Sequence, residues 1–152
     1  AIAEAFAKGD DAGLRRTLRV AAWGTLGFTL PAAGALFVAG PYALGLFGPG
    51  FGAAFPALAI ILAGQAVNAA TGPVAAVMTM TGRQKAAAAI TFAAFAGNLA
   101  LNAALIPRYG IAGAAGATAI TAAAMNLAML GYCLGVLKLN PTAVGGFGGR
   151  RG

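Results

Sequence analysis

Five amide side chains are the strongest hydrogen-bonding groups within the long apolar runs of this sequence. Two lie three residues apart, two lie four apart and one stands alone, namely Gln65 and Asn68, Asn98 and Asn102, and Asn126. Residues three or four apart share one face of a helix, so each pair presents its amides together. Amides donate and accept hydrogen bonds but do not exchange protons at neutral pH. We therefore expect them either to line a polar cavity or to join packed helices to one another.

The sequence contains few side chains that could support acid–base, nucleophilic or metal chemistry. The sequence has no histidine, and its only acidic residues, Glu4, Asp10 and Asp11, all precede the first long apolar run. Its single cysteine, Cys133, lies inside an apolar run, where we expect a small buried residue. Most hydrolytic and metal-dependent reactions require groups of these types. The sequence thus predicts no catalytic residue, no metal site and no cofactor.

The hydropathy pattern predicts helices that cross a lipid bilayer. Of the 152 residues, 60% are hydrophobic and 9% are charged, whereas a soluble domain carries about 25% charged residues. The apolar residues form runs of about twenty, the length that crosses the bilayer core as a helix. We predict an all-α polytopic bundle with about four transmembrane helices, at residues 20–39, 53–80, 86–106 and 111–137. An amphipathic lead-in at residues 1–19 and a disordered tail at residues 138–152 are expected to flank it.

The ten lysine and arginine residues are distributed unevenly between the predicted loops. Four precede the first span, two lie between the second and third spans, three lie in the tail, and Arg108 alone follows the third span. Because cytoplasmic loops are enriched in lysine and arginine, we expect both termini and the loop with Arg83 and Lys85 to be cytoplasmic. The uncharged loop at residues 40–51 is expected at the opposite interface. The net charge of +7 does not indicate nucleic-acid binding, because the cations flank apolar runs and do not form a solvent-exposed basic surface.

Prolines and glycines are expected to shape the spans and their turns. Pro31 predicts a kink in the first span, which neighbouring helices can tolerate in a membrane. Gly72 and Pro73 interrupt the second span, either as a hinge or as a fixed kink. Pro107 and Gly110 predict a very short turn between antiparallel spans. After this turn, small residues recur at helical spacing and form a face that lets another helix approach closely. They are Gly113, Gly116, Ala117 and Ala124.

The order of motifs along residues 1–140 resembles that of bacterial polysaccharide flippases. The string TGRQK at residues 81–85 and the string NLALNAALIPRYGIAGAAGATAI at residues 98–120 are similar to the late helices of O-antigen and lipid-linked oligosaccharide exporters. The strings GDDAGLRRTLR and LFGPGFGAAFPAL are similar to the stretch that precedes those helices. These exporters belong to the multidrug/oligosaccharidyl-lipid/polysaccharide superfamily. The most specific element runs from Leu101 through Pro107 to Ala115.

The resemblance implies that the chain is the C-terminal part of a two-lobed transporter in the bacterial inner membrane. The sequence begins with Ala1, and we expect it to start within a longer protein whose N-terminal lobe precedes it. Such a transporter, surrounded by membrane lipid, would flip a lipid-linked glycan by alternating access. It would make and break no bond, so the resemblance implies that the protein is not an enzyme. The five amides would then either contact the glycan or bond one another within the bundle. Arg83 and Lys85 would either attract the diphosphate of the substrate or only fix the topology.

Two other interpretations remain open at this point. A cation-coupled multidrug exporter of the same superfamily would carry an intramembrane carboxylate upstream of this chain, since no predicted span here has a charged residue in its interior. A small self-associating membrane scaffold would need only these four spans. The sequence upstream of Ala1 distinguishes these interpretations.

Overall fold

The computed structural model describes residues 11–48, 50–137 and 140–142 of the chain. Within these residues the regular structure is entirely helical, which confirms the predicted all-α class. The elements, in chain order, are α2 (Asp11–Leu46), the 3-10 turn η1 (Phe51–Ala54), α3 (Phe55–Thr71), α4 (Val74–Met80), α5 (Gln84–Tyr132) and the π-helical turn η2 (Cys133–Leu137). Residues 1–10 of the expected lead-in and most of the expected tail at 138–152 lie outside the described residues.

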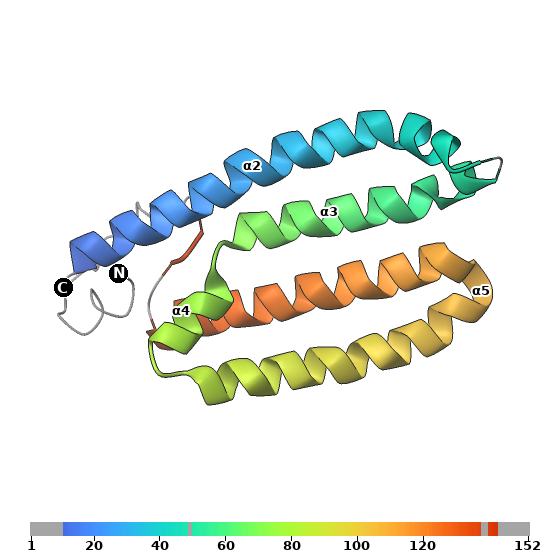
Figure 1. Ribbon diagram of the computed structural model, residues 1–152. Coiled ribbons are helices and arrows are strands. Elements are labelled where there is room, and N and C mark those ends of the chain that lie inside the picture. The colour runs from blue at the N-terminus through green and yellow to red at the C-terminus, as the bar shows by residue number, and fades with distance from the viewer. Residues whose placement is uncertain (1–10, 49, 138–139, 143–152) are drawn as a thin grey trace.

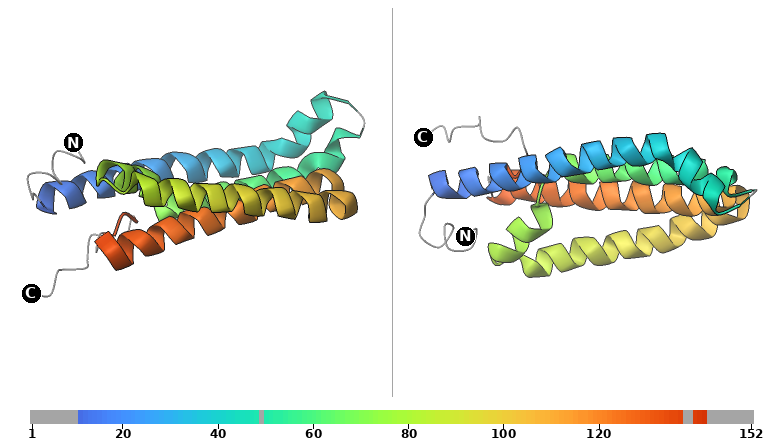
Figure 2. Two further views of the ribbon diagram at one scale, coloured as in Figure 1. Left: turned by 90° about the horizontal axis from the view of Figure 1, so that it is seen from below. Right: turned by 45° about the horizontal axis from the view of Figure 1, so that its top comes forward.

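The first helix, α2, is longer than the span predicted at residues 20–39. It continues to Leu46, although the prolines and glycines of residues 40–46 favour a loop. Pro31 and Pro41 both lie inside it and are exposed. A proline within a helix removes one backbone hydrogen bond and bends the helix, and at these exposed positions no packed neighbour opposes the bend. Figure 2 shows the last turns of α2 leaving the line of the rest of the helix.

The span predicted at residues 53–80 is divided into two helices. α3 ends at Thr71 and α4 begins at Val74. Between them Gly72 has φ 74° and ψ −167°, a conformation that L side chains disfavour. Pro73 follows with φ −80° and ψ 50°, which is not helical either. Gly72 and Pro73 therefore separate a helix of 17 residues from one of 7 residues.

The long helix α5 turns back on itself at Gly110. This residue has φ 55° and ψ −129°, outside the helical range, and Figure 1 shows the ribbon reversing its direction within α5. We call residues 84–109 the first limb of α5 and residues 111–132 the second limb. Pro107 stays inside the helix, so the reversal of the chain depends on the positive φ that Gly110 adopts readily.

The spatial order of the helices differs from their order along the chain. Figure 1 shows α2, α3, the second limb and the first limb side by side in that order. Figure 2 shows that these helices form a thin, curved layer. A Cβ atom at Gly64 of α3 would lie 3.0 Å from the Cβ of Ala119 on the second limb. The second limb thus lies between α3 and the first limb.

The largest buried side chains gather at one end of this layer, where α4 lies. They come from α2, α4, both limbs of α5 and η2, and form one apolar cluster. Its members are Leu18, Val74, Val77, Met78, Ala87, Met129 and Cys133. We call this the α4 end, and the opposite end, which holds η1 and Gly110, the far end (Figure 1).

Three helical segments are long and apolar enough to cross a membrane, at Arg16–Leu46, Phe51–Thr71 and Gln84–Leu137. Few of their side chains are buried within the protein, and large apolar ones such as Phe28 and Leu46 are 78% and 90% exposed. Soluble monomers rarely expose large contiguous apolar surfaces. The three segments therefore suggest a membrane-embedded protein.

Candidate functional site

A chain of amide and hydroxyl groups joins the two limbs of α5. Asn102 Nδ2 donates to the side-chain oxygen and to the carbonyl oxygen of Asn98, both at 2.9 Å. Asn98 Nδ2 donates across to Thr121 Oγ1 on the second limb, also at 2.9 Å. The Thr121 hydroxyl donates to the carbonyl of Ala117 at 2.7 Å. The amides of the first limb therefore bond to each other and to the second limb.

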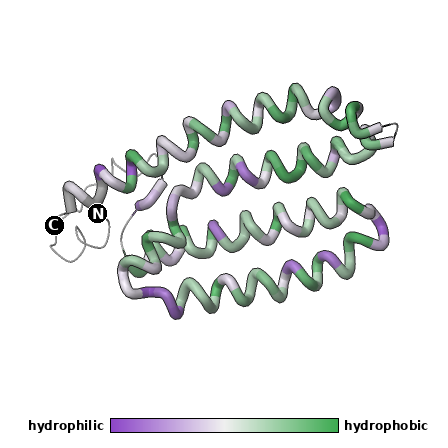
Figure 3. The backbone as a smooth tube through the Cα atoms, in the orientation of Figure 1, coloured by the Kyte–Doolittle hydropathy of each residue, from purple (hydrophilic) through white to green (hydrophobic). Residues whose placement is uncertain are grey.

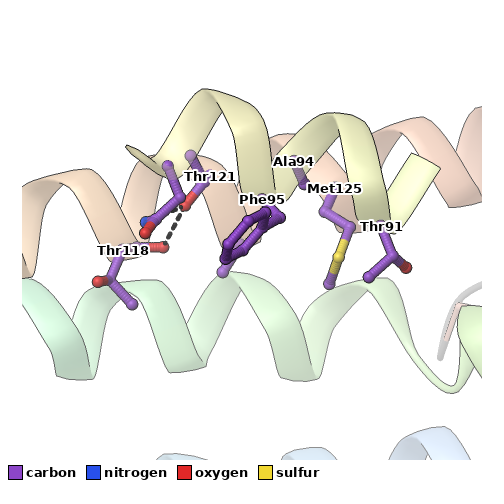
Figure 4. Close-up of a pocket in the computed structure, with 8 residues that line it drawn as sticks. Thr91, Ala94, Phe95, Thr118, Thr121 and Met125 are labelled. Atoms are coloured by element: carbon purple, nitrogen blue, oxygen red, sulfur yellow. Dashed lines mark hydrogen bonds between the residues drawn. The ribbon is translucent and has the colours of Figure 1, made fainter. Parts of the chain in front are cut away.

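An open hollow of about 300 Å³ lies beside this chain of hydrogen bonds, between the limbs. Its lining residues are Thr91, Ala94, Phe95, Asn98, Thr118, Thr121, Ala122 and Met125. Figure 4 shows the ring of Phe95 between the two threonines of the second limb and the pair formed by Thr91 and Met125. The Thr91 hydroxyl donates to its own helix, at Ala87 O, at 2.9 Å. The hollow is therefore lined mainly by apolar groups, with few polar groups that could orient a ligand.

Asn126 lies apart from this hydrogen-bond chain. Its side chain is buried, and Nδ2 donates to the carbonyl of Ala122 one turn earlier, at 2.9 Å. Among the described residues, no buried side-chain nitrogen or oxygen lacks a hydrogen-bond partner. Asn126 thus bonds within its own helix, and it does not line the hollow.

Gln65 and Asn68 form a separate, exposed pair on α3. Asn68 Nδ2 lies 3.4 Å from Gln65 Oε1, which is longer than the 2.7–3.2 Å usual for such a bond. Neither residue lines the hollow between the limbs. The structure therefore does not bring the five predicted amides together, and this pair keeps exposed donors and acceptors.

The described cations are exposed and lie at the two ends of the layer. Arg16 and Arg19 lie near the start of α2, and Arg83 and Lys85 lie at the turn into α5, so all four are at the α4 end. Arg108 lies next to the reversal at the far end. Figure 3 shows hydrophilic positions at both ends, with longer apolar stretches between them. An excess of cations at one end is the pattern that the positive-inside rule associates with the cytoplasmic side.

The predicted packing glycines differ in how closely other atoms approach them. A Cβ atom at Gly113 would lie 2.7 Å from the carbonyl carbon of Leu105, so the second limb passes directly against the backbone of the first. At Gly116 no such atom lies within 4 Å of the Cβ position. The close approach expected of the small-residue face is therefore present at Gly113 and absent at Gly116.

Sequence reasoning missed the partners that the second limb and the hollow supply. The sequence analysis does not predict a role for Thr118, Thr121 or Phe95. Threonine hydroxyls in helices commonly bond to their own backbone, as Thr121 also does here. A signal existed nonetheless. Asn98 lies twelve residues before Gly110, and Thr121 lies eleven residues after it. A hairpin centred on Gly110 brings these two positions to nearly the same level.

The interactions that the described side chains form are hydrogen bonds and close packing contacts. No group of three or more histidine, cysteine, aspartate or glutamate residues that could hold a metal ion occurs in the part of the chain that the structure describes. In comparisons with known proteins, no family model, curated protein or solved structure matches the chain.

Proposed function

We propose that the chain is part of a flippase that moves lipid-linked oligosaccharide or polysaccharide precursors across the bacterial inner membrane. The observation that carries the proposal is the motif series from Leu101 to Ala115, which resembles this family and contains the hairpin of α5. The three long apolar helices and the thin layer they form suit one wall of a larger helical lobe. Flipping makes and breaks no bond, so the proposal assigns no catalytic group.

In this proposal the two limbs of α5 cross the membrane separately, which gives four spans. At about 1.5 Å per residue, the 26 residues of the first limb extend about 39 Å and the 22 residues of the second about 33 Å. Both lengths exceed the hydrocarbon core of about 30 Å. The α4 end, with Arg16, Arg83 and Lys85, then lies on the cytoplasmic side.

We assign glycan contact to Gln65 and Asn68. Their amides are exposed, and the long bond between them is a weak competitor for a sugar hydroxyl. Asn98 and Asn102 are better explained as links between the limbs, since they bond to each other and to Thr121. Because the pair lies on α3, the proposal does not require the hairpin of α5 to contact the glycan. The hairpin then serves as a rigid support for the other helices.

Arg83 and Lys85 are proposed to meet the diphosphate of the substrate as well as to fix the orientation. Both side chains are exposed at the α4 end, Arg83 in the turn between α4 and α5 and Lys85 in the first turn of α5. Exposed cations near a membrane surface attract phosphate groups by about 1 kcal/mol each. This contribution is large enough to affect substrate entry.

The test is complementation by the full-length protein in a bacterial strain that lacks its own flippase. Surface glycan is expected to return. The double variant Gln65→Ala with Asn68→Ala should reduce it at equal protein level, whereas Asn98→Ala should reduce it only as far as it lowers the amount of folded protein. No glycan at the surface with well-expressed wild-type protein would overturn the proposal.

A labelling experiment tests the orientation and the number of spans. With Cys133 replaced by alanine, single cysteines at Gln84 and at Tyr109 are treated with a membrane-impermeant maleimide in intact cells and in inverted vesicles. We expect Gln84→Cys to react only in inverted vesicles and Tyr109→Cys only in intact cells. Reaction of both cysteines from the same side would contradict separate crossings by the two limbs.

A further inference from the structure

The break between α3 and α4 is occupied by a segment from beyond α5. A Cβ atom at Gly72 would lie 3.1 Å from the carbonyl carbon of Pro141, and closer still to its carbonyl oxygen. The same atom would lie 3.6 Å from the Cβ of Ala22 on α2. Pro141 itself is fully buried. Gly72 is therefore needed both for its positive φ and for the space that Pro141 fills.

A local turn holds Pro141 in this position. The side-chain oxygen of Asn140 accepts a hydrogen bond from the backbone N–H of Thr142 at 3.1 Å, and another from the Thr142 hydroxyl at 2.7 Å. Such a turn, closed by an asparagine side chain two residues upstream, fixes the backbone around the intervening residue. Figure 1 shows this short red segment beside α2 and the start of α4.

The helix that follows the break is short, and its start lies in this region. α4 has seven residues, and its first backbone bonds are made by Val74 N to Gly72 O at 2.8 Å and by Val77 N to Pro73 O at 3.0 Å. The sulfur of Cys133, which begins η2, lies 4.0 Å from the carbonyl oxygen of Val74. The start of α4 is thus enclosed by α2, by η2 and by residues 140–142.

We propose that residues 140–142 are a latch that fixes the angle between α3 and α4. With Pro141 in place, its carbonyl group lies against Gly72 and holds the break as a rigid kink. When the latch leaves, the same two residues become a hinge, because the positive φ of Gly72 is one of several conformations open to glycine. The latch does not depend on the proposed flippase activity.

The test compares two glycines with positive φ. Gly72 has φ 74° and Gly82 has φ 77°, so both have a φ that L side chains rarely adopt. A Cβ atom at Gly82 would meet nothing within 4 Å, whereas one at Gly72 would collide with Pro141. Because Gly72 also has ψ −167°, an excess effect of Gly72→Ala over Gly82→Ala combines backbone strain with this collision. Variants of Pro141 and Asn140 leave Gly72 unchanged and therefore report the contact with the latch separately.

The measurement is amide hydrogen exchange in lipid nanodiscs, followed at Val77, whose N–H bonds to Pro73 O. We expect Gly72→Ala and Pro141→Gly each to speed exchange at Val77 by about tenfold, and Gly82→Ala to change it by less than about twofold. Asn140→Ala, which leaves Gly72 and Pro141 intact, should give an intermediate increase. The combination Gly72→Ala with Pro141→Gly should be no faster than the faster single variant.

Two outcomes would overturn the latch. One is an equal effect of Gly72→Ala and Gly82→Ala, which would assign the change to backbone strain alone. The other is unchanged exchange at Val77 in Pro141→Gly, in protein whose helix content matches the wild type. The hydrogen-exchange experiment does not measure surface glycan, so its result is independent of the test of flippase activity.

Discussion

The α4 end and the far end of the layer are packed in opposite ways. At the α4 end the buried residues include large side chains, such as Leu18, Met78 and Met129. Toward the far end the buried residues are small, and at Gly113 the second limb of α5 approaches the backbone of the first. These small residues are Gly40, Ala57, Gly113, Ala115 and Ala117.

The difference indicates which kind of change each end can tolerate. A cluster of large side chains loses contacts when atoms are removed, because the cavity is only partly refilled. A contact between backbones is disrupted when atoms are added, because the backbones must separate. In a membrane this packing is important, since lipid tails are as apolar as the side chains and the hydrophobic effect adds little to helix association.

The largest effect is expected from removing atoms at the α4 end. Met78 is fully buried, and Met78→Ala should lower the free energy of unfolding by about 2–5 kcal/mol. The measurement is denaturant unfolding in detergent micelles. Met80, two residues later and 48% exposed, is the matched control, and Met80→Ala should change stability by less than about 0.5 kcal/mol. Equal effects at the two methionines would mean that the cluster at the α4 end is not formed.

The next largest effect is expected from adding one carbon at the far end. Gly113→Ala places a Cβ atom against the carbonyl group of Leu105, and we expect it to destabilise the protein by about 1–3 kcal/mol. Gly116→Ala is the control, because no neighbour meets its Cβ atom and alanine favours the helix by up to about 1 kcal/mol. The same unfolding assay should give opposite signs for the two variants. A stabilising Gly113→Ala would refute backbone packing between the limbs.

A smaller effect is expected where the limbs meet through hydrogen bonds. Asn98→Ala removes the bond to Thr121 and should lower stability by about 0.6–1.7 kcal/mol. Asn68→Ala, on the exposed pair, should have almost no effect. A double-mutant cycle of Asn98→Ala with Thr121→Val measures the bond directly, and strictly additive effects would show that the bond contributes nothing.

The smallest effect is expected where an added carbon meets a flexible side chain. A Cβ atom at Gly40 would lie 2.8 Å from Cδ2 of Leu58, at the end of a side chain that can rotate away. Gly40→Ala should therefore change stability by less than about 0.5 kcal/mol, since a better helix residue offsets the displacement. If Gly40→Ala lowers the free energy of unfolding as much as Gly113→Ala does, then a flexible neighbouring side chain does not reduce the effect of the added carbon.

The sequence predicts the helical class well and the helix ends poorly. Long apolar runs give helices, and the string PRYG places the reversal of α5 within four residues that include Gly110, although Pro107 stays helical in the structure. The same reasoning ends the first helix too early, because Pro41 and its neighbouring glycines favour a loop in isolation. In the structure Pro41 is exposed, so it bends α2 without breaking it.

Contacts between distant segments are the part that local patterns do not contain. Nothing in the sequence near Asn98 identifies Thr121 as its partner until the position of the reversal is known. Nor does any pattern near Gly72 indicate Pro141, which lies 69 residues away. The exposed pair of Gln65 and Asn68 follows directly from the three-residue spacing, because its geometry is set within one helix.

The position of the second limb also has a consequence for biosynthesis. The ribosome makes α3 and the first limb before the second limb, yet the second limb lies between them (Figure 1). Because chains emerge from the N-terminus onward, α3 and the first limb are both synthesised before their common neighbour exists. α3 and the first limb must therefore remain apart in the bilayer, or separate again, so that the second limb can insert between them. A nascent chain that stops before residue 111 therefore lacks the neighbour that separates α3 from the first limb, and the second limb completes the packing of both.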